Sequence, residues 1–143
     1  MASKLYGNFL LKALNKEVDF DSDTIKVALL TSSYTPDQDA HDYFNDVSTY
    51  EVTGTGYTSG GATLASKTAT YDSGTNVIVL DAADVTWSSS TITARYAVVY
   101  DSTGTASTSA LIGYVDFGSD QSSTNGNFTI TWDSTGIVRI TVA

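Results

Sequence analysis

Three aspartates near the start of the chain have a spacing that could bind a cation. Asp19, Asp21 and Asp23 match the Asp-x-Asp-x-Asp opening of a calcium-binding loop. Such a loop also needs a glycine at its sixth position and a glutamate at its twelfth, where this chain has Thr24 and Leu30. Because both residues are missing, we interpret the three aspartates as a solvated turn and predict no calcium site there.

A second acidic cluster surrounds the only histidine. Its members all lie within a short stretch of the chain: Asp37, Asp39, His41, Asp42 and Asp46. One imidazole among carboxylates could ligate a divalent ion. The cluster has no regular spacing, so we interpret it as a polar loop and predict no metal and no other cofactor.

The sequence contains no convincing catalytic nucleophile. A Ser–His–Asp triad would have to use His41, and the chain has no Gly-x-Ser-x-Gly elbow. Asp-Ser-Thr-Gly occurs at 101–104 and at 133–136, but both copies have one residue more before glycine than the motif of aspartic proteases. Turns between strands explain both copies. The sequence therefore predicts a protein that is not an enzyme.

Composition narrows the class of protein further. The chain has 143 residues, no cysteine and a net charge of −9, which predicts one domain, 1–143, without disulfides. Nucleic acid is not an expected partner, because phosphate contacts need clustered lysine and arginine. A membrane is not expected either, because no stretch approaches the ~20 apolar residues of a span. The charge is uneven: residues 1–16 carry +3, and the rest of the chain carries −12.

The N-terminal pattern predicts a helix over about 3–16. Ser3 can cap it, and Lys12 and Lys16 lie near its C-terminal end, where the helix dipole favours cations. Leu11 lies off the apolar stripe and is expected to be exposed. The stripe itself consists of Leu5, Tyr6, Phe9, Leu10, Ala13 and Leu14.

After residue 23 the chain has the pattern of a β protein. The segment 94–101 has apolar residues at alternate positions on both faces, which predicts a central strand covered on both sides. Residues 31–61 form a long contact loop without a clear period, in which Tyr43 and Phe44 could start a helical turn. Further strands are expected at 24–30, 63–71, 76–80, 85–87 and 110–117. A break is expected at 88–90 and a polar loop at 118–126. Residues 127–132 and 136–142 are expected to pair as a terminal hairpin.

These elements predict a mainly β fold, either an antiparallel β-sandwich or a jelly-roll-like barrel, with one N-terminal α-helix. The sandwich core is expected within 62–143. Seven aromatic residues could instead line a sugar-binding face, although core packing explains them better. They are Tyr50, Tyr57, Trp87, Tyr96, Tyr100, Tyr114 and Trp132.

Several segments, taken in order along most of the chain, resemble small structural proteins of tailed bacteriophages. They are Ala2 to Phe9, Ile25 to Thr31 with Tyr34 to Asp39, Thr53 to Gly61, and Ala94 to Asp101. The resemblance implies a component of the virion and does not by itself distinguish capsid from tail.

An acidic, cysteine-free β domain without a catalytic motif suits a capsid decoration or cement protein on the outer shell, away from packaged DNA. Its expected partners are the major capsid protein and copies of itself, as a trimer or dimer. A carbohydrate- or receptor-binding module of a tail or fibre, or a tail or neck component, stays open. The expected contact residues lie in the N-terminal helix and the long loop: Lys4, Leu11, Lys12, Tyr34, Pro36, Tyr43, Phe44 and Tyr57.

Overall fold

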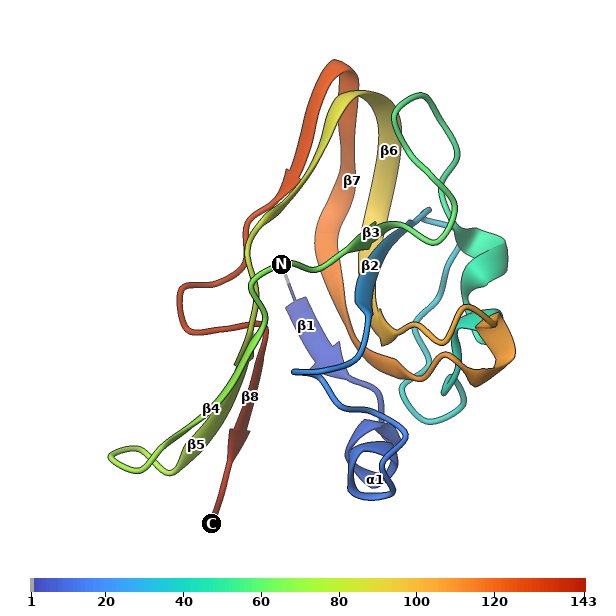
Figure 1. The fold of residues 1–143 in the computed structure, drawn as a ribbon. Helices are drawn as coiled ribbons and strands as arrows, with labels where there is room; N and C mark the ends of the chain where they lie inside the picture. Colours follow the sequence, from blue (N-terminus) through green and yellow to red (C-terminus); the bar gives the residue numbers. More distant parts are fainter. Residues whose placement is uncertain (1) are drawn as a thin grey trace.

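The structure is a computed structural model, and it describes residues 2–143. It confirms a mainly β chain with antiparallel sheets in a sandwich-like arrangement and one N-terminal α-helix (Figure 1). The larger sheet has the strand order β1-β7-β6-β2-β3 and the smaller one β4-β5-β8. The elements are β1 (Ala2–Leu5), α1 (Phe9–Leu14), β2 (Ile25–Leu30), β3 (Ala62–Thr63), β4 (Thr68–Asp72), β5 (Val77–Asp81), β6 (Val85–Asp101), β7 (Leu111–Ile130) and β8 (Val138–Thr141), with short 3-10 turns at Phe44–Asp46, Ser48–Tyr50 and Ala106–Thr108.

The paired strands β6 and β7 connect the two halves of the fold. They pair from Val85–Ile130 to Tyr100–Leu111, with four register shifts. Figure 1 shows this ribbon rising to one end of the molecule and turning over there. Ser89 and Asn125 have positive φ close to the shifts. Bulges bend and twist a strand pair in this way. The ribbon belongs to the larger sheet, and its Val85–Ile130 end lies next in the chain to β5 and β8 of the smaller sheet.

This bend corrects two predictions from the sequence, the break at 88–90 and the polar loop at 118–126. Both stretches belong to continuous strands. Ser90 is fully buried, and its hydroxyl bonds the Trp87 carbonyl at 3.0 Å, the Ser123 hydroxyl at 2.7 Å and the Gly126 carbonyl at 3.0 Å. A serine satisfied in this way can occupy an interior position, which a search for apolar alternation does not detect.

The larger sheet is covered on both faces, as the pattern of 94–101 predicts. Ala97 and Val99 belong to a hydrophobic cluster between the sheets, and Val98 and Tyr100 to a second cluster beneath the 31–61 loop. The core is not confined to 62–143. Buried residues before that range also contribute to it, among them Phe9, Val18, Phe20, Ile25, Val27 and Leu29.

The predicted helix over 3–16 is wrong in its first part. Residues 2–5 form β1 on the edge of β7, with Leu5 opposite Gly113, and the Tyr6 N–H continues this pairing to the Ile112 carbonyl at 3.1 Å. Only the six residues of α1 are helical, because pairing with β7 satisfies the backbone before the helix can begin. Leu10 and Leu14, predicted to be buried, are exposed.

The predicted terminal hairpin is also wrong, because β8 pairs with β5 and not with β7. Trp132 directs the chain away from β7: its backbone N–H donates to Asp84 at 2.9 Å and its indole N–H to the Ala83 carbonyl at 3.1 Å. The expected strand at 63–71 is likewise divided. β3 lies in the larger sheet and β4 in the smaller, with Ser66 at φ 53° between them.

Candidate interaction surface

Helix α1 is fastened to the 31–61 loop by one buried lysine. The Lys12 ammonium donates to Asp42 Oδ2 at 3.0 Å and lies 3.8 Å from the centre of the Tyr43 ring. The Tyr43 hydroxyl donates to Glu17 at 2.9 Å, just beyond the helix. The structure thus brings together the two segments that the sequence suggested as contacts. It also shows that Lys12 is buried, so this side chain holds the surface in place and does not present a charge to a partner.

We predict that Lys12→Met destabilises the protein by about 1–3 kcal/mol, because Asp42 loses a charge-assisted hydrogen bond and Tyr43 loses a cation–π contact. Urea unfolding followed by far-ultraviolet circular dichroism measures the change. Lys16→Met removes an exposed lysine from the same segment and serves as the control. Equal stability of the two variants would show that the Lys12 contacts do not stabilise the fold.

Tyr34 and Phe44 are core residues and not surface contacts, contrary to the sequence prediction. The Tyr34 hydroxyl bonds the Tyr6 hydroxyl at 2.8 Å and His41 Nδ1 at 3.1 Å. Burial raises the pKa of Tyr34 to about 12, so its hydroxyl stays neutral. Phe44 stacks on Tyr100, with ring centroids 4.1 Å apart. Both side chains anchor the long loop to the larger sheet.

Tyr57 also faces inward. Its hydroxyl donates to Glu51 at 2.6 Å and accepts the Leu29 N–H at 3.0 Å. Burial, together with the hydrogen bond to Glu51, raises the pKa of Tyr57. These contacts close the end of the long loop onto β2, so Tyr57 positions the loop.

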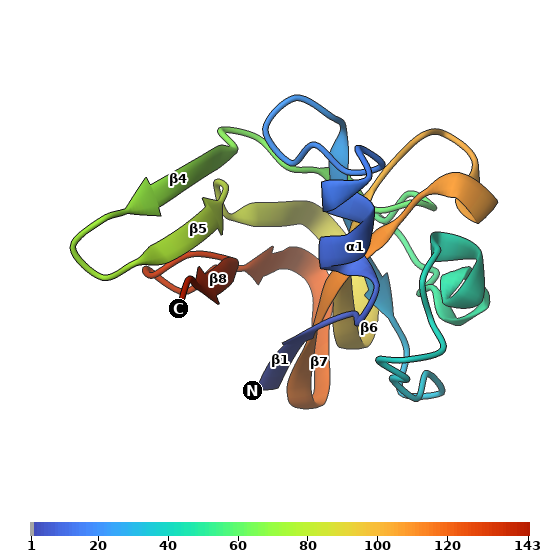
Figure 2. The same cartoon turned by 90° about the horizontal axis from the view of Figure 1, so that it is seen from below.

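The remaining suggested contacts lie nearer the surface. Lys4 and Leu11 are exposed, whereas Pro36 and Tyr43 are half-buried. Leu11 is accompanied by two leucines whose exposure the sequence did not predict. The three form the leucine patch of α1: Leu10 at 43% exposure, Leu11 at 57% and Leu14 at 83%. Figure 2, viewed from the end of the molecule where α1 lies, shows the helix outermost.

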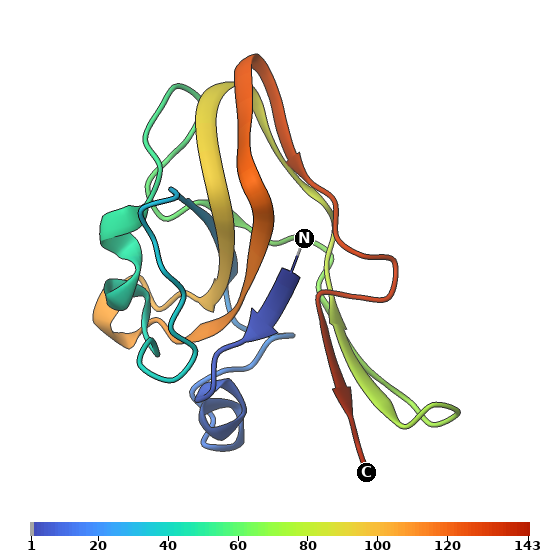
Figure 3. The same ribbon diagram turned by 180° about the vertical axis from the view of Figure 1, so that it is seen from behind.

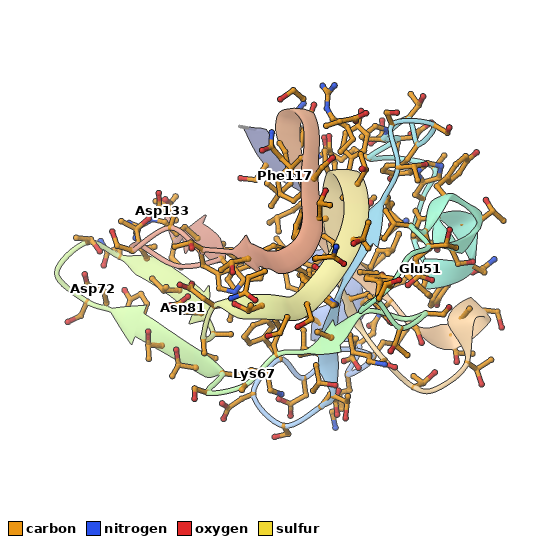
Figure 4. The ribbon with its side chains drawn as sticks, turned by 90° about the horizontal axis from the view of Figure 1, so that it is seen from above. Glu51, Lys67, Asp72, Asp81, Phe117 and Asp133 are labelled. Atoms are coloured by element: carbon orange, nitrogen blue, oxygen red, sulfur yellow. The ribbon has the colours of Figure 1, made fainter. Side chains whose placement is uncertain are left out.

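A second hollowed surface, which the sequence did not indicate, lies where the two sheets separate. Two adjoining hollows of about 580 and 350 Å³ share Ser3, Val115, Asp133, Gly136 and Ile137 in their walls. We call them together the seam groove. The smaller hollow is bounded by residues of the edge strands β1 and β8. Phe117 and Trp132 line the larger hollow, and Figure 4 shows Phe117 and Asp133 at the flank of the fold where the groove lies.

The Asp19–Asp23 turn already contains a cation from the chain itself. The Lys67 ammonium donates to the backbone carbonyls of Phe20 at 3.0 Å, Asp21 at 3.3 Å and Asp23. The Asp19 carboxylate accepts the Ser22 N–H at 3.1 Å. Within residues 2–143, no group of three or more histidine, aspartate and glutamate side chains is arranged to hold a metal ion.

The acidic cluster around His41 has structural roles in the loop. Asp37 accepts the N–H groups of Asp39 at 3.1 Å and Ala40 at 2.9 Å. The Asp46 carboxylate accepts the N–H groups of Asp42 and Tyr43 at 2.9 and 3.1 Å. These carboxylates close local turns, which explains their irregular spacing.

Asp101, at the end of β6 and the first residue of the Asp-Ser-Thr-Gly copy at 101–104, is a carboxyl whose burial was not predicted. It is 3% exposed, and no donor in the described part of the chain reaches its Oδ2. Burial raises the pKa of Asp101 to about 7, and the neighbouring Asp23 carboxyl contributes to the rise. Near neutral pH the Asp101 carboxyl is therefore only partly ionised.

Comparison with known proteins adds no relative: no protein-family model, no curated protein and no solved structure matches the chain. No helix in residues 2–143 is long and apolar enough to cross a membrane.

Proposed function

We propose that this protein is a structural component of a phage particle that decorates the outer capsid shell and binds it through the leucine patch of α1. The observation that carries the proposal is the patch itself. Of the five large hydrophobic residues that are exposed in the described part of the chain, three lie within one six-residue helix. Contiguous exposed apolar residues mark protein–protein contacts in otherwise polar proteins.

The helix that carries the leucine patch is held firmly against the rest of the protein, as a binding surface requires. Lys12 lies between the exposed leucines in sequence, yet it is buried against Asp42 and Tyr43. Phe9, from the same helix, is 3% exposed and packs in the core. The helix is thus fixed before any partner arrives, so binding loses little conformational entropy on this side of the contact.

The charge of the chain agrees with an outer position on the shell. Residues 17–143 carry all 16 acidic residues and a net charge of −12, within a chain whose net charge is −9. An acidic domain is repelled by packaged DNA and is placed more favourably on the outside of the shell. The resemblance of several segments to small phage structural proteins points to the same kind of particle.

A carbohydrate-binding module has less support. Such a module would present aromatic rings to solvent, but of the seven aromatic residues considered for this role, Trp87 and Tyr100 are buried. The other five are half-buried. Among the described residues, Tyr71 is the one aromatic residue that is largely exposed to solvent.

Heat challenge of capsids tests the proposal. A protein that binds only the assembled shell stabilises that shell by linkage, so capsids saturated with it should rupture at a higher temperature than capsids without it. DNA release followed with an intercalating dye gives the rupture temperature. An unchanged rupture temperature at saturating occupancy would refute stabilisation of the shell.

Deleting residues 1–16 is not a suitable test of shell binding. The deletion removes β1 from the edge of β7, and it removes Tyr6 and Phe9, which are 1% and 3% exposed, from the two hydrophobic clusters. We expect the truncated chain to lose most of its stability, because each buried aromatic contributes about 3–5 kcal/mol. Point substitutions on the exposed face of α1 avoid this difficulty.

A further inference from the structure

The hairpin formed by β4 and β5, which we call the arm, has one strand that buries no side chain in this chain. All five residues of β4 are exposed, and Tyr71 is 55% exposed. Ordering a residue costs about 1–2 kcal/mol of backbone entropy, and in return β4 gains its pairing with β5 and exposed hydrogen bonds of Tyr71 and Asp72 within the hairpin, but no apolar burial. Figure 3 shows the arm projecting from the body.

The outer edge of β4 has only part of the usual protection against pairing with other strands. Natural edge strands are kept short or are shielded by charged residues, proline or a bulge. β4 is five residues long and carries one charge, Asp72, at its end, but residues 68–71 contain no charge and no proline, and the pairing with β5 has no register shift. An exposed edge with so little protection is open to pairing with another surface.

The seam groove is a hollow in which an exposed strand such as β4 could bind. It exposes parts of Phe117, Trp132 and Ile137, which are half-buried and pack against the core between the sheets. The edge strands β1 and β8 border its smaller hollow. An extended segment seated there would find both an apolar floor and strand edges available for pairing.

The charges of the arm and the groove are complementary. The arm, residues 68–81, contains Asp72 and Asp81 and no cation, and the ammonium of Lys67, which precedes it, is bound to the carbonyls of Phe20 and Asp21. Hydrogen bonds from the Thr75 hydroxyl and the Gly74 N–H hold the pKa of Asp72 below its usual range, so its carboxylate is charged. The groove is lined by Lys4, Arg139 and one carboxylate, Asp133. Because Arg139 already lies near Asp72 and Asp133 of its own chain, Lys4 is the cation that the Asp72 of a second copy would meet.

We infer that the arm of one copy seats in the seam groove of a second copy, with Tyr71 against the apolar lining and Asp72 near Lys4. Because arm and groove are different surfaces, the contact is heterologous, and it forms a closed ring where the rotation between copies permits. We choose a second copy as the occupant because its arm brings the acidic Asp72 to the basic Lys4 of the groove. Such a match of opposite charges favours this contact over others between two chains that are both acidic. The inference does not depend on shell binding, since the purified protein suffices to test it.

Sedimentation velocity on the purified full-length protein, from about 1 to 500 µM, measures the association. We expect a mass that rises to a multiple of the 15.1 kDa chain. Tyr71→Asp and Lys4→Glu should each weaken association by about tenfold or more, since either change damages one side of the contact. Both side chains are exposed, so both variants should fold.

Mixing the two variants gives the sharper result. A Tyr71→Asp chain keeps an intact groove and a Lys4→Glu chain keeps an intact arm, so the mixture should form heterodimers at concentrations at which each variant alone is largely monomeric. Leu14→Asp, which alters the leucine patch, and Lys16→Glu, which changes the same charge outside the groove, should associate like wild type. A monomer over the whole concentration range would overturn the inference. Association that neither the Tyr71 nor the Lys4 variant weakens would also overturn it and would leave the groove to another partner.

Discussion

Replacing Leu11 and Leu14 together by aspartate is expected to weaken binding to capsid shells by about 100-fold or more. Truncation of a central apolar contact costs about 2 kcal/mol or more in a protein interface, and each 1.4 kcal/mol is tenfold in affinity. Aspartate adds the desolvation of a carboxylate to this loss. The two leucines are 57% and 83% exposed, so they contribute little to folding and the variant should stay folded.

The matched control for this variant is Val142→Asp. Val142 is 45% exposed, and it follows β8 in the chain, whereas the patch lies on α1. It receives the same chemical change on a different surface. Binding by the control together with loss of binding by the leucine variant would place the contact on α1. Equal binding by both variants would remove the patch from the interface.

Asp101→Asn is expected to stabilise the protein at pH 8 by about 2–4 kcal/mol. The Asp101 carboxyl is buried beside the Asp23 carboxyl, and its pKa is raised to about 7. Each unit of pKa shift corresponds to about 1.4 kcal/mol of differential interaction. Asparagine has nearly the same shape, is neutral, and can donate a hydrogen bond to Asp23, so the cost of ionising a buried group disappears.

The direction of the pH dependence follows from linkage. In the unfolded chain Asp101 ionises near its ordinary pKa of 3.8, and in the folded protein near 7. Between these values the folded state holds more protons, so this group's contribution to stability is present below about pH 4 and is lost as the pH rises to about 7. The gain from Asp101→Asn should therefore be near zero at pH 4 and complete above pH 7.

Asp133→Asn should change the stability in the opposite direction from Asp101→Asn. Hydrogen bonds from the Thr135 hydroxyl and N–H hold the pKa of Asp133 below its usual range. Its contribution is present above the ordinary pKa and is lost as the pH falls, so the asparagine variant should lose stability at neutral pH. Urea unfolding at pH 4, 6 and 8 measures both variants. An Asp101→Asn protein that is no more stable than wild type at pH 8 would contradict the conclusion that burial raises the pKa of Asp101.

Sequence patterns predicted the parts of the fold where burial follows a simple period. The segment 94–101 alternates on two apolar faces and forms the doubly covered half of β6, and the expected strand at 24–30 corresponds to β2. The long segment at 31–61 contains short 3-10 turns, one of which begins at Phe44 as expected. In these segments local pattern and tertiary environment agree.

The errors occurred where a distant partner decides the structure. Residues 3–5 fit a helical stripe, but the edge of β7 pairs with them first. Residues 136–142 follow a turn sequence, but β5 provides the pairing. The interior role of Ser90 depends on Ser123, which is 33 positions away in the chain. Local periodicity contains no information on such contacts.

Distant contacts also decide how the suggested contact residues are arranged. The N-terminal helix and the long loop were each expected to supply contacts, and the Lys12–Asp42 pair joins the two segments. Which side chains face outward depends on the length of α1, because a helix of six residues does not bury the apolar stripe that was predicted for a helix over residues 3–16. Lys12 was therefore expected at the surface and Leu14 inside, the reverse of what the structure shows.

Cosedimentation with capsid shells prepared without this protein tests the proposed role most directly. Purified protein is titrated onto the shells and the pellet is quantified against the major capsid protein. We predict saturable binding at a fixed ratio for wild type, and protein left in the supernatant for Leu11→Asp combined with Leu14→Asp. Wild-type protein that stays in the supernatant at every concentration would contradict a role as a capsid decoration protein.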